Sequence, residues 1–202
     1  MIGVGMTKCF WTVLAVAACL SAPAATALDT PQDSAIAALT DKIRQSPGNA
    51  YYYNNRGLAY MQKGDFDHAI ADFNQAMRLY PMKSSAAFNN RAMAYAGKGQ
   101  YDRALADFKS SIGLDAKNAW TFNNRGLVLG KKGDARKAIA DYSEAIRLSP
   151  RYVVAYQNRA SAFLGAGDRK RARADLEEAA RLQPSLQNDA AFIKARQEAE
   201  VP

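Results

Sequence analysis

The stretch YNNRGLAYMQKGDFDHAIADFNQAMRLYP, residues 53–81, decides the fold, because the chain repeats it with changes three more times. The later copies begin at Phe88, Phe122 and Tyr156, and every copy carries an arginine at its fourth position, Arg56 in the first. These arginines are 35, 34 and 34 residues apart. Such a period indicates stacked copies of one supersecondary unit that cannot bury its apolar face alone. We therefore expect an all-α solenoid whose function lies on a surface shared by neighbouring repeats.

Each copy predicts two helices joined by a tight turn. In the first copy, small and apolar residues recur at helical spacing over residues 50–63 and again over residues 66–79. A glycine separates the two helices, and we expect it to adopt the left-handed conformation that ends a helix. An aspartate after it is a predicted N-cap, and a proline stops the second helix. The glycines are Gly64, Gly99, Gly133 and Gly167, the aspartates are Asp65, Asp134 and Asp168, and the prolines are Pro81, Pro150 and Pro184. The second copy has Gln100 in place of the aspartate and Ala116 in place of the proline.

Small residues mark the places where the two helices of a unit must approach closely. They are Gly57, Ala92, Gly126 and Ala160 on the first helix and Ala69, Ala104, Ala138 and Ala172 on the second, with Phe73, Phe108, Tyr142 and Leu176 beside them. This pattern resembles the tetratricopeptide repeat (TPR), and the resemblance extends from Asp33 almost to the C-terminus. It implies an α-solenoid that forms a right-handed superhelix, with a concave groove lined by the first helices.

The resemblance divides the chain into repeats with partial units at both ends. We expect a half repeat of the second-helix type at residues 33–47, because residues 35–47 align with residues 69–81. Four full repeats should follow at residues 50–83, 85–118, 119–152 and 153–186. A capping helix is expected at residues 186–200, with Leu186, Ala190 and Ile193 facing inward and Lys194, Arg196 and Glu198 facing outward.

Residues 1–27 have the features of an export signal. Lys8 precedes a short apolar run at residues 9–20, and residues 25–27 (ATA) form a small–x–small cleavage pattern. The run is too short for a membrane span, which needs roughly 20 residues. Residues 16–19 (VAAC) also resemble the lipobox of bacterial lipoproteins, so a lipid anchor at Cys19 is the alternative to cleavage after Ala27. We expect an exported protein, periplasmic or secreted, with an outer-membrane lipoprotein as the alternative.

Both cysteines lie in this leader, so a chain cleaved after Ala27 has no disulfide and no thiol chemistry. The formal net charge of +8 is spread over all repeats, with one denser patch at residues 169–173. Because no nucleic-acid-binding motif accompanies that patch, we interpret it as a solvated helix face and expect no nucleic-acid partner.

Two amide side chains precede the arginine in every copy. They are Asn54 and Asn55, Asn89 and Asn90, Asn123 and Asn124, and Gln157 and Asn158. Asparagine is a poor helix former, so its recurrence needs a reason. An amide offers a donor and an acceptor, as the backbone of an extended peptide requires, and the resemblance places these residues in the groove. Peptide binding is therefore one interpretation, and hydrogen bonding between adjacent repeats is the other.

Groove residues that differ between copies are candidates for specificity. Tyr51 and Trp120 are expected as aromatic platforms, Leu58, Met93 and Leu127 as apolar pockets, and Lys131 as a charge. The carboxylate clamp by which some TPR proteins hold chaperone C-termini needs basic residues at three places that here hold Asn54, Trp120 and Asn124. Only Asn90 fits that pattern, so we do not expect this chain to bind chaperone tails.

The repeated arginines precede an aspartate by sixteen residues in every copy. The pairs are Arg56 and Asp72, Arg91 and Asp107, Arg125 and Asp141, and Arg159 and Asp175. Because the spacing is constant, we predict partly buried ion pairs that stabilise the repeats and do not contact a ligand.

Catalytic groups are scarce. His68 is the one histidine, so no multi-histidine metal site can form, and no phosphate-binding glycine loop is present. We expect no enzyme activity, no metal and no cofactor. The prediction is a non-catalytic scaffold that binds a peptide or protein segment. The alternatives are a lipoprotein that recruits cell-wall enzymes and an adaptor that self-assembles through residues 35–43.

Overall fold

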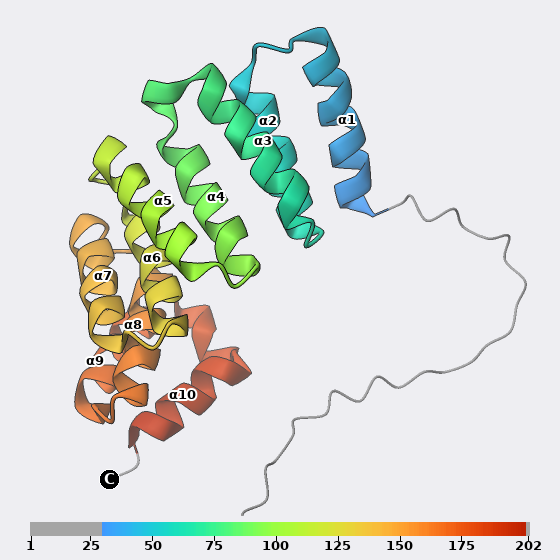
Figure 1. Cartoon of the computed structure of the whole chain (residues 1–202). Coiled ribbons are helices and arrows are strands. Elements are labelled where there is room, and N and C mark those ends of the chain that lie inside the picture. Colours follow the sequence, from blue (N-terminus) through green and yellow to red (C-terminus); the bar gives the residue numbers. More distant parts are fainter. Residues whose placement is uncertain (1–29, 201–202) are drawn as a thin grey trace, which may run out of the picture.

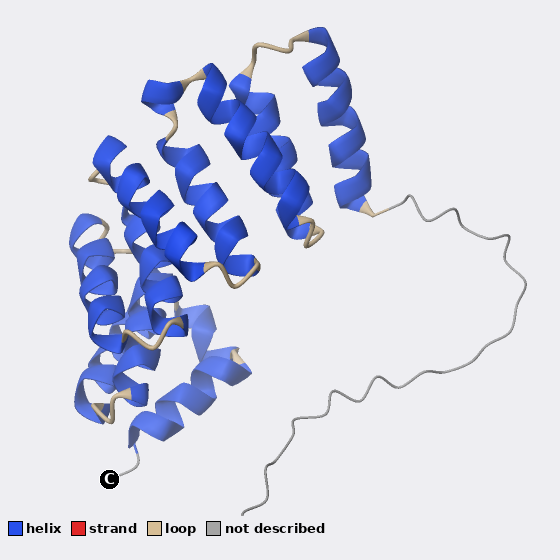
Figure 2. Ribbon diagram, viewed as in Figure 1, coloured by secondary structure: helices blue, strands red, loops and turns tan. Residues whose placement is uncertain are grey.

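The computed structural model describes residues 30–200, and this part of the chain contains ten α-helices, two short 3-10 helices and no strand (Figures 1 and 2). The predicted all-α fold is confirmed. The helices are α1 (Pro31–Gln45), α2 (Ala50–Gln62), α3 (Phe66–Leu79), η1 (Pro81–Lys83), α4 (Ser85–Gly97), α5 (Tyr101–Leu114), α6 (Ala119–Lys131), α7 (Ala135–Leu148), α8 (Val153–Gly165), α9 (Arg169–Leu182), η2 (Pro184–Asn188) and α10 (Ala190–Glu200).

Four helical hairpins, α2–α3, α4–α5, α6–α7 and α8–α9, correspond to the four copies of the repeated sequence. Each hairpin turns at its glycine, whose φ is positive: 78° at Gly64, 73° at Gly99, 92° at Gly133 and 77° at Gly167. In the first turn the Gly64 N–H donates to Met61 O and the Asp65 N–H donates to Tyr60 O. This pair of bonds is the Schellman motif, which requires the left-handed conformation that glycine adopts without strain.

The predicted aspartate caps form at two of the three turns. The carboxylate of Asp65 accepts from the backbone N–H of His68, and that of Asp168 accepts from the N–H of Arg171. Asp134 makes no side-chain cap, so that prediction is wrong; its carboxylate accepts a hydrogen bond from the Lys137 ammonium at 2.9 Å.

The core of each hairpin forms where small residues let the two helices approach. The four alanines of the second helices are fully buried, and so are Phe73 and Phe108. In the first repeat, a Cβ placed on Gly57 would lie 2.7 Å from a ring carbon of Phe73. In the third repeat, a Cβ on Gly126 would lie equally close to the ring of Tyr142. Glycine at these two positions therefore lets an aromatic ring lie directly on the helix backbone.

Successive hairpins stack along a curve (Figure 1). The first helices of neighbouring repeats contact one another, α2 with α4, α4 with α6 and α6 with α8, and α8 in turn contacts α10. These helices therefore line the inner side of the curve. At the edge formed by the hairpin turns, a lysine that ends one first helix pairs with an aspartate near the start of the preceding second helix. These pairs are Lys63 with Asp33, Lys98 with Asp67 and Lys132 with Asp102.

The two ends of the array differ from the full repeats. Helix α1 packs on α2 as an unpaired second helix, and it begins at Pro31 with Thr30 as its N-cap. The capping helix expected at residues 186–200 is interrupted, because Asp189 caps a new helix by accepting from the Phe192 N–H at 2.8 Å. This restart changes the buried face: Phe192 and Ala199 are buried, whereas Ala190 and Ile193, which were expected to face inward, are exposed, Ile193 at 40%.

The export signal, Cys19 and the proposed cleavage site lie outside the described residues. Within residues 30–200, no helix has the length and apolar character that a membrane crossing requires.

Candidate functional site

The paired amides of the four repeats lie on the first helices, where they connect each repeat with the one before it. The second amide of a repeat donates a hydrogen bond from Nδ2 to the Oδ1 atom of the first amide of the preceding repeat. The three bonds run from Asn90 to Asn54 at 3.1 Å, from Asn124 to Asn89 at 3.2 Å and from Asn158 to Asn123 at 2.8 Å. The amides therefore form a ladder that follows the inner face of the array.

The ladder ends at Asn55 and Gln157, whose side chains have no hydrogen-bond partner in residues 30–200. Asn55 lies next to α1, which is a second helix and carries no amide pair. Gln157 lies next to α10, which also lacks one. Both side chains are half-buried and lie at the two ends of the inner face.

The bridging bonds leave part of each amide's capacity unused. An asparagine side chain has two N–H donors and an oxygen with two lone pairs. Asn124 and Asn158 each use one N–H for the bridge, so their second N–H and their oxygen have no partner among the described residues. Asn123 is 2% exposed and is restricted to the bridge, whereas the other amides are half-buried. The same amides can thus connect repeats and also bind a guest chain.

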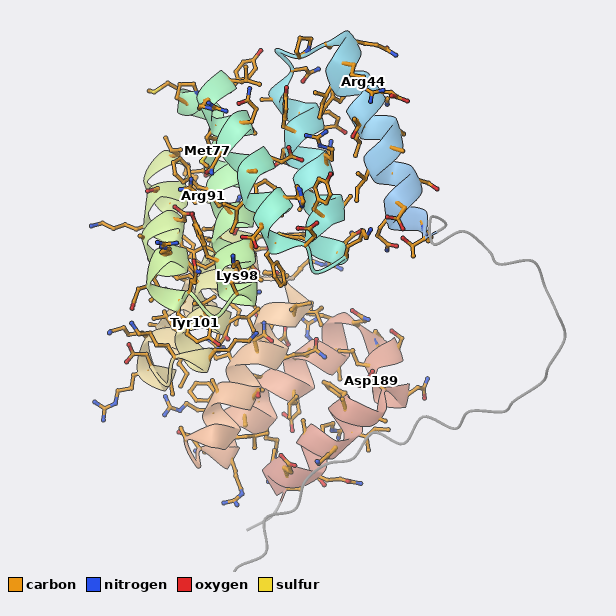
Figure 3. The ribbon with its side chains drawn as sticks, turned by 45° about the vertical axis from the view of Figure 1, so that its right-hand side comes forward. Arg44, Met77, Arg91, Lys98, Tyr101 and Asp189 are labelled. Carbon is orange, nitrogen blue, oxygen red and sulfur yellow. The ribbon has the colours of Figure 1, made fainter. Side chains whose placement is uncertain are left out.

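Each repeated arginine forms two hydrogen bonds to the aspartate of its own hairpin. The Nε and Nη2 atoms lie 2.8 and 2.7 Å from the carboxylate oxygens in the Arg56–Asp72 pair, 2.7 and 2.6 Å in Arg91–Asp107, 2.7 and 2.7 Å in Arg125–Asp141, and 2.8 and 2.7 Å in Arg159–Asp175. Figure 3 labels Arg91, which extends from α4 toward α5. The aspartates are buried, so these groups are committed to the packing of the hairpins.

The Nη1 atom of the arginine reaches the preceding repeat in three of the four copies. It donates to Thr40 in the first copy, to Asn74 in the second and to Ser143 in the fourth. The equivalent residue for Arg125 is Lys109, which cannot accept, and the Arg125 Nη1 has no hydrogen-bond partner within residues 30–200. The junction between α5 and α6 therefore lacks a polar connection that the other junctions have.

The aspartates raise the pKa of all four arginines, since each carboxylate hydrogen-bonds to the charged guanidinium, and burial opposes this effect. The guanidinium groups also lie against aromatic rings of the same helix; the centre of Arg91, for example, is 5.5 Å from the Phe88 ring centroid. The arginines stay charged and held in place, and so contribute no titratable group to the inner face.

The two predicted aromatic platforms are among the most exposed apolar side chains, with Tyr51 at 67% and Trp120 at 68%. Trp120 stacks on Tyr152 with ring centroids 5.9 Å apart and an interplanar angle of 13°. Tyr51 lines a cavity of about 360 Å³ together with Asn54 and Tyr80. Both rings lie at the start of a first helix, and one of them is adjacent to the amide ladder.

Two further cavities lie between first helices at the C-terminal half of the array. One, of about 360 Å³, lies between α6 and α8 and is lined by Leu127, Lys131 and Asn158 among others. The other, of about 590 Å³, lies between α8 and α10 and includes Gln157 and Asp189, the latter labelled at the start of α10 in Figure 3. The structure thus brings together three of the predicted groove residues in the first of these cavities.

Two predicted apolar pockets do not form at the expected residues. Leu58 packs against the core cluster around Phe73, and Met93 packs against the cluster around Phe108. Both are half-buried parts of the hydrophobic core and line none of the cavities described above.

The sequence-based prediction missed Gly130, Tyr142 and Ser161, which line the cavity between α6 and α8. The signal was present in the alignment of the copies. Gly130 stands where the other repeats have Met61, Ala96 and Leu164, and Tyr142 stands where they have Phe73, Phe108 and Leu176. Burial raises the pKa of Tyr142 to about 12, with a smaller contribution from the charge of Asp141.

Within the described residues, no group of three or more His, Cys, Asp or Glu side chains is arranged to hold a metal ion.

Family models match more than half of the 202 residues. A model described as tetratricopeptide repeat matches residues 50–82 and 119–152, one described as TPR repeat matches residues 92–133, and a second tetratricopeptide repeat model matches residues 153–186. No curated protein matches the chain in a sequence search.

Several solved structures are similar. A crystal structure of MamA is 25% identical, with a TM-score of 0.65 over 78% of this chain and 91% of that one. TTC0263, a thermophilic TPR protein of Thermus thermophilus, is 19% identical, with a TM-score of 0.72 over 81% and 90%. YrrB, described as a TPR protein with an unusual peptide-binding site, is 19% identical, with a TM-score of 0.61 over 82% and 84%.

Proposed function

Because this chain belongs to the tetratricopeptide repeat family, whose members mediate protein–protein interactions, we propose that it is a non-catalytic scaffold that binds an extended segment of a protein partner. The binding surface is the inner face formed by α2, α4, α6 and α8. The observation that carries this proposal is the amide ladder, which spans all four repeats and retains unpaired donors and acceptors.

The amides other than Asn123 suit an extended guest chain because an amide can bind one backbone N–H and one backbone C=O. At about 1 kcal/mol for each net hydrogen bond, a few such contacts give binding that depends little on the guest's sequence. The exposed ring of Trp120 and the cavities between first helices supply contacts that differ from repeat to repeat. These contacts would select the partner.

Two double variants test the proposal, because they break the same two bridges from opposite sides. Asn90→Ala with Asn124→Ala removes the donors, and Asn54→Ala with Asn89→Ala removes the acceptors. Each pair should cost about 3 kcal/mol of stability, since three hydrogen bonds are lost, the two bridges and the bond from Asn89 to Asn90. We expect the first pair to weaken the binding of peptides selected from a random library by at least tenfold, and the second pair to weaken it clearly less.

The measurement is peptide titration followed through the fluorescence of Trp120, which is the one tryptophan after the leader, with urea unfolding of both variants alongside. Wild-type affinity in both double variants would assign the amides to stability alone. A finding that the wild-type chain binds none of the selected peptides in solution would refute the scaffold function at this surface.

Export is also part of the proposal, and its support is the leader sequence of residues 1–27. Mass spectrometry of the mature N-terminus distinguishes cleavage after Ala27 from a lipid-modified Cys19. An uncleaved N-terminus in the producing cell would refute both.

A further inference from the structure

The cavity between α6 and α8 differs from the rest of the inner face because only the third repeat has the residues that open it. Its volume is about 360 Å³, and small residues on both sides, Gly130 and Ala162 among them, leave the space empty of side chains. In the other repeats the position of Gly130 holds methionine, alanine or leucine. The cavity is therefore specific to one place along the array.

The most unusual group in this cavity is the hydroxyl of Tyr142. The side chain is 4% exposed, and its ring packs against Gly126 in the hairpin core. The hydroxyl lies 4.0 Å from the position that a Cβ on Gly130 would occupy, and it forms no hydrogen bond within residues 30–200. Buried hydroxyls normally have a hydrogen-bond partner. Among the described residues, every fully buried side-chain N or O atom has such a partner, so a hydroxyl without one is not fully enclosed. The Tyr142 hydroxyl must therefore open into the cavity.

All the other polar side chains of the cavity can also donate hydrogen bonds. Lys131 forms no ion pair among the described residues and contributes a positive charge. Asn158 keeps one N–H after its bond to Asn123, and Ser161 has an unpaired hydroxyl. No carboxylate lines this cavity, in contrast to the neighbouring cavity between α8 and α10, which contains Asp189 and Glu198.

The Tyr142 hydroxyl keeps its proton at neutral pH. The pKa of Tyr142 is raised to about 12 by burial, so the phenol remains protonated and can donate. The cavity thus offers four side-chain donors and one positive charge with no carboxylate beside them, which favours a ligand group that accepts hydrogen bonds and carries a negative charge.

We infer that this cavity binds a carboxylate of the guest chain, with its aliphatic stem against Leu127 and Ala162. The inference rests on the proposed function, because the guest must lie along the inner face. It concerns residues other than the three basic places of the carboxylate clamp, which hold Asn54, Trp120 and Asn124 here. The carboxylate belongs either to a Glu or Asp side chain or to the C-terminus of the guest.

Three peptides test the inference on the mature chain. The first is an acetylated and amidated alanine peptide with one central Glu, the second is the same peptide with Gln, and the third is an alanine–leucine peptide with a free C-terminal carboxylate. Binding is followed by ¹H–¹⁵N chemical-shift titration at the amides of Gly130 and Gly165. We expect at least one carboxylate peptide to bind tenfold more tightly than the Gln peptide, and the tighter of the two identifies the source of the carboxylate.

The repeats themselves supply conservative variants. Tyr142→Phe installs the residue that the first two repeats carry in the same place, and Lys131→Gln installs the residue of the first repeat. Both should preserve folding and lower carboxylate affinity about fivefold or more, and they should lower affinity for the Gln peptide less.

The outcomes separate this inference from the scaffold proposal. Equal binding of the Glu, Gln and free-carboxylate peptides overturns the carboxylate preference, and it leaves the scaffold proposal standing if Asn90→Ala with Asn124→Ala weakens all three. Unchanged carboxylate affinity in both Tyr142→Phe and Lys131→Gln also overturns the inference. If no peptide binds, both proposals fail.

Discussion

The ion pair between Arg91 and Asp107 offers the sharpest test of how the repeats are stabilised. Asp107→Asn keeps the size and one acceptor oxygen but removes the negative charge. Arg91 donates two hydrogen bonds to this carboxylate, at 2.7 and 2.6 Å. The two side chains are 20% and 9% exposed, so water compensates only a small part of the loss.

The magnitude follows from these contacts. A hydrogen bond to a charged group contributes about 1.5–3 kcal/mol, and breaking a buried pair costs about 3–5 kcal/mol when the remaining charge is left alone. The Asn oxygen keeps one bond, and Arg91 keeps its contact with Asn74. We therefore expect Asp107→Asn to lower the free energy of unfolding by about 2–3 kcal/mol and the Tm by roughly 5–10 °C.

The control is Asp41→Asn, which removes an aspartate from the exposed pair with Arg44 on α1. Those side chains are 75% exposed for Arg44 and 63% for Asp41, and such a pair contributes less than about 1 kcal/mol. Urea unfolding followed by circular dichroism at neutral pH measures both variants. If Asp107→Asn were no less stable than Asp41→Asn, the interpretation of the buried pairs as the stabilising element of each hairpin would be refuted.

Three further predictions concern stability. The pKa of Tyr142 is raised from 10.0 to about 12 in the folded chain, so its contribution to stability is present below pH 10 and is lost as the pH rises toward 12, up to about 3 kcal/mol. The free energy of unfolding of the wild type should therefore fall more than that of Tyr142→Phe over this pH range. Parallel curves of unfolding free energy against pH would contradict this prediction. Lys109→Ser should give Arg125 an acceptor, as the fourth repeat has, and raise the free energy of unfolding by about 1 kcal/mol; an unchanged urea midpoint would count against it. Gly99→Ala should destabilise by about 1–2 kcal/mol because φ is 73° there, whereas Gly113→Ala, in open space on α5, should stabilise by up to about 1 kcal/mol; opposite signs in thermal unfolding are the required result.

The fold was predictable because the evidence for it is local and repeated. The glycine turns and the two helical periodicities occur in every copy, so independent errors in one copy do not change the result. The C-terminal helix was harder, since it occurs once. A single aspartate at position 189 restarts the helix and shifts its buried face to Phe192, and sequence periodicity alone does not detect such a restart.

The site was only partly predictable. The amides were identified from their recurrence, but their hydrogen bonds connect residues about 35 positions apart, and the choice between bridge and groove depends on side-chain geometry. Tyr142 was assigned to the core because its ring is there. Its hydroxyl reaches the cavity because Gly130, on the neighbouring helix, has no side chain there. Such a contact between two helices is visible only in the structure.

The arginine connections between repeats have one gap, at Arg125, where Lys109 replaces an acceptor. In a solenoid, total stability is approximately a sum over units and their neighbour contacts, so one missing hydrogen bond affects the coupling of a single junction. The α5–α6 junction still has the Lys132–Asp102 ion pair and the contact between the Ser111 and Thr121 hydroxyls. An accepting side chain at position 109 would make the arginine connections continuous from one end of the array to the other.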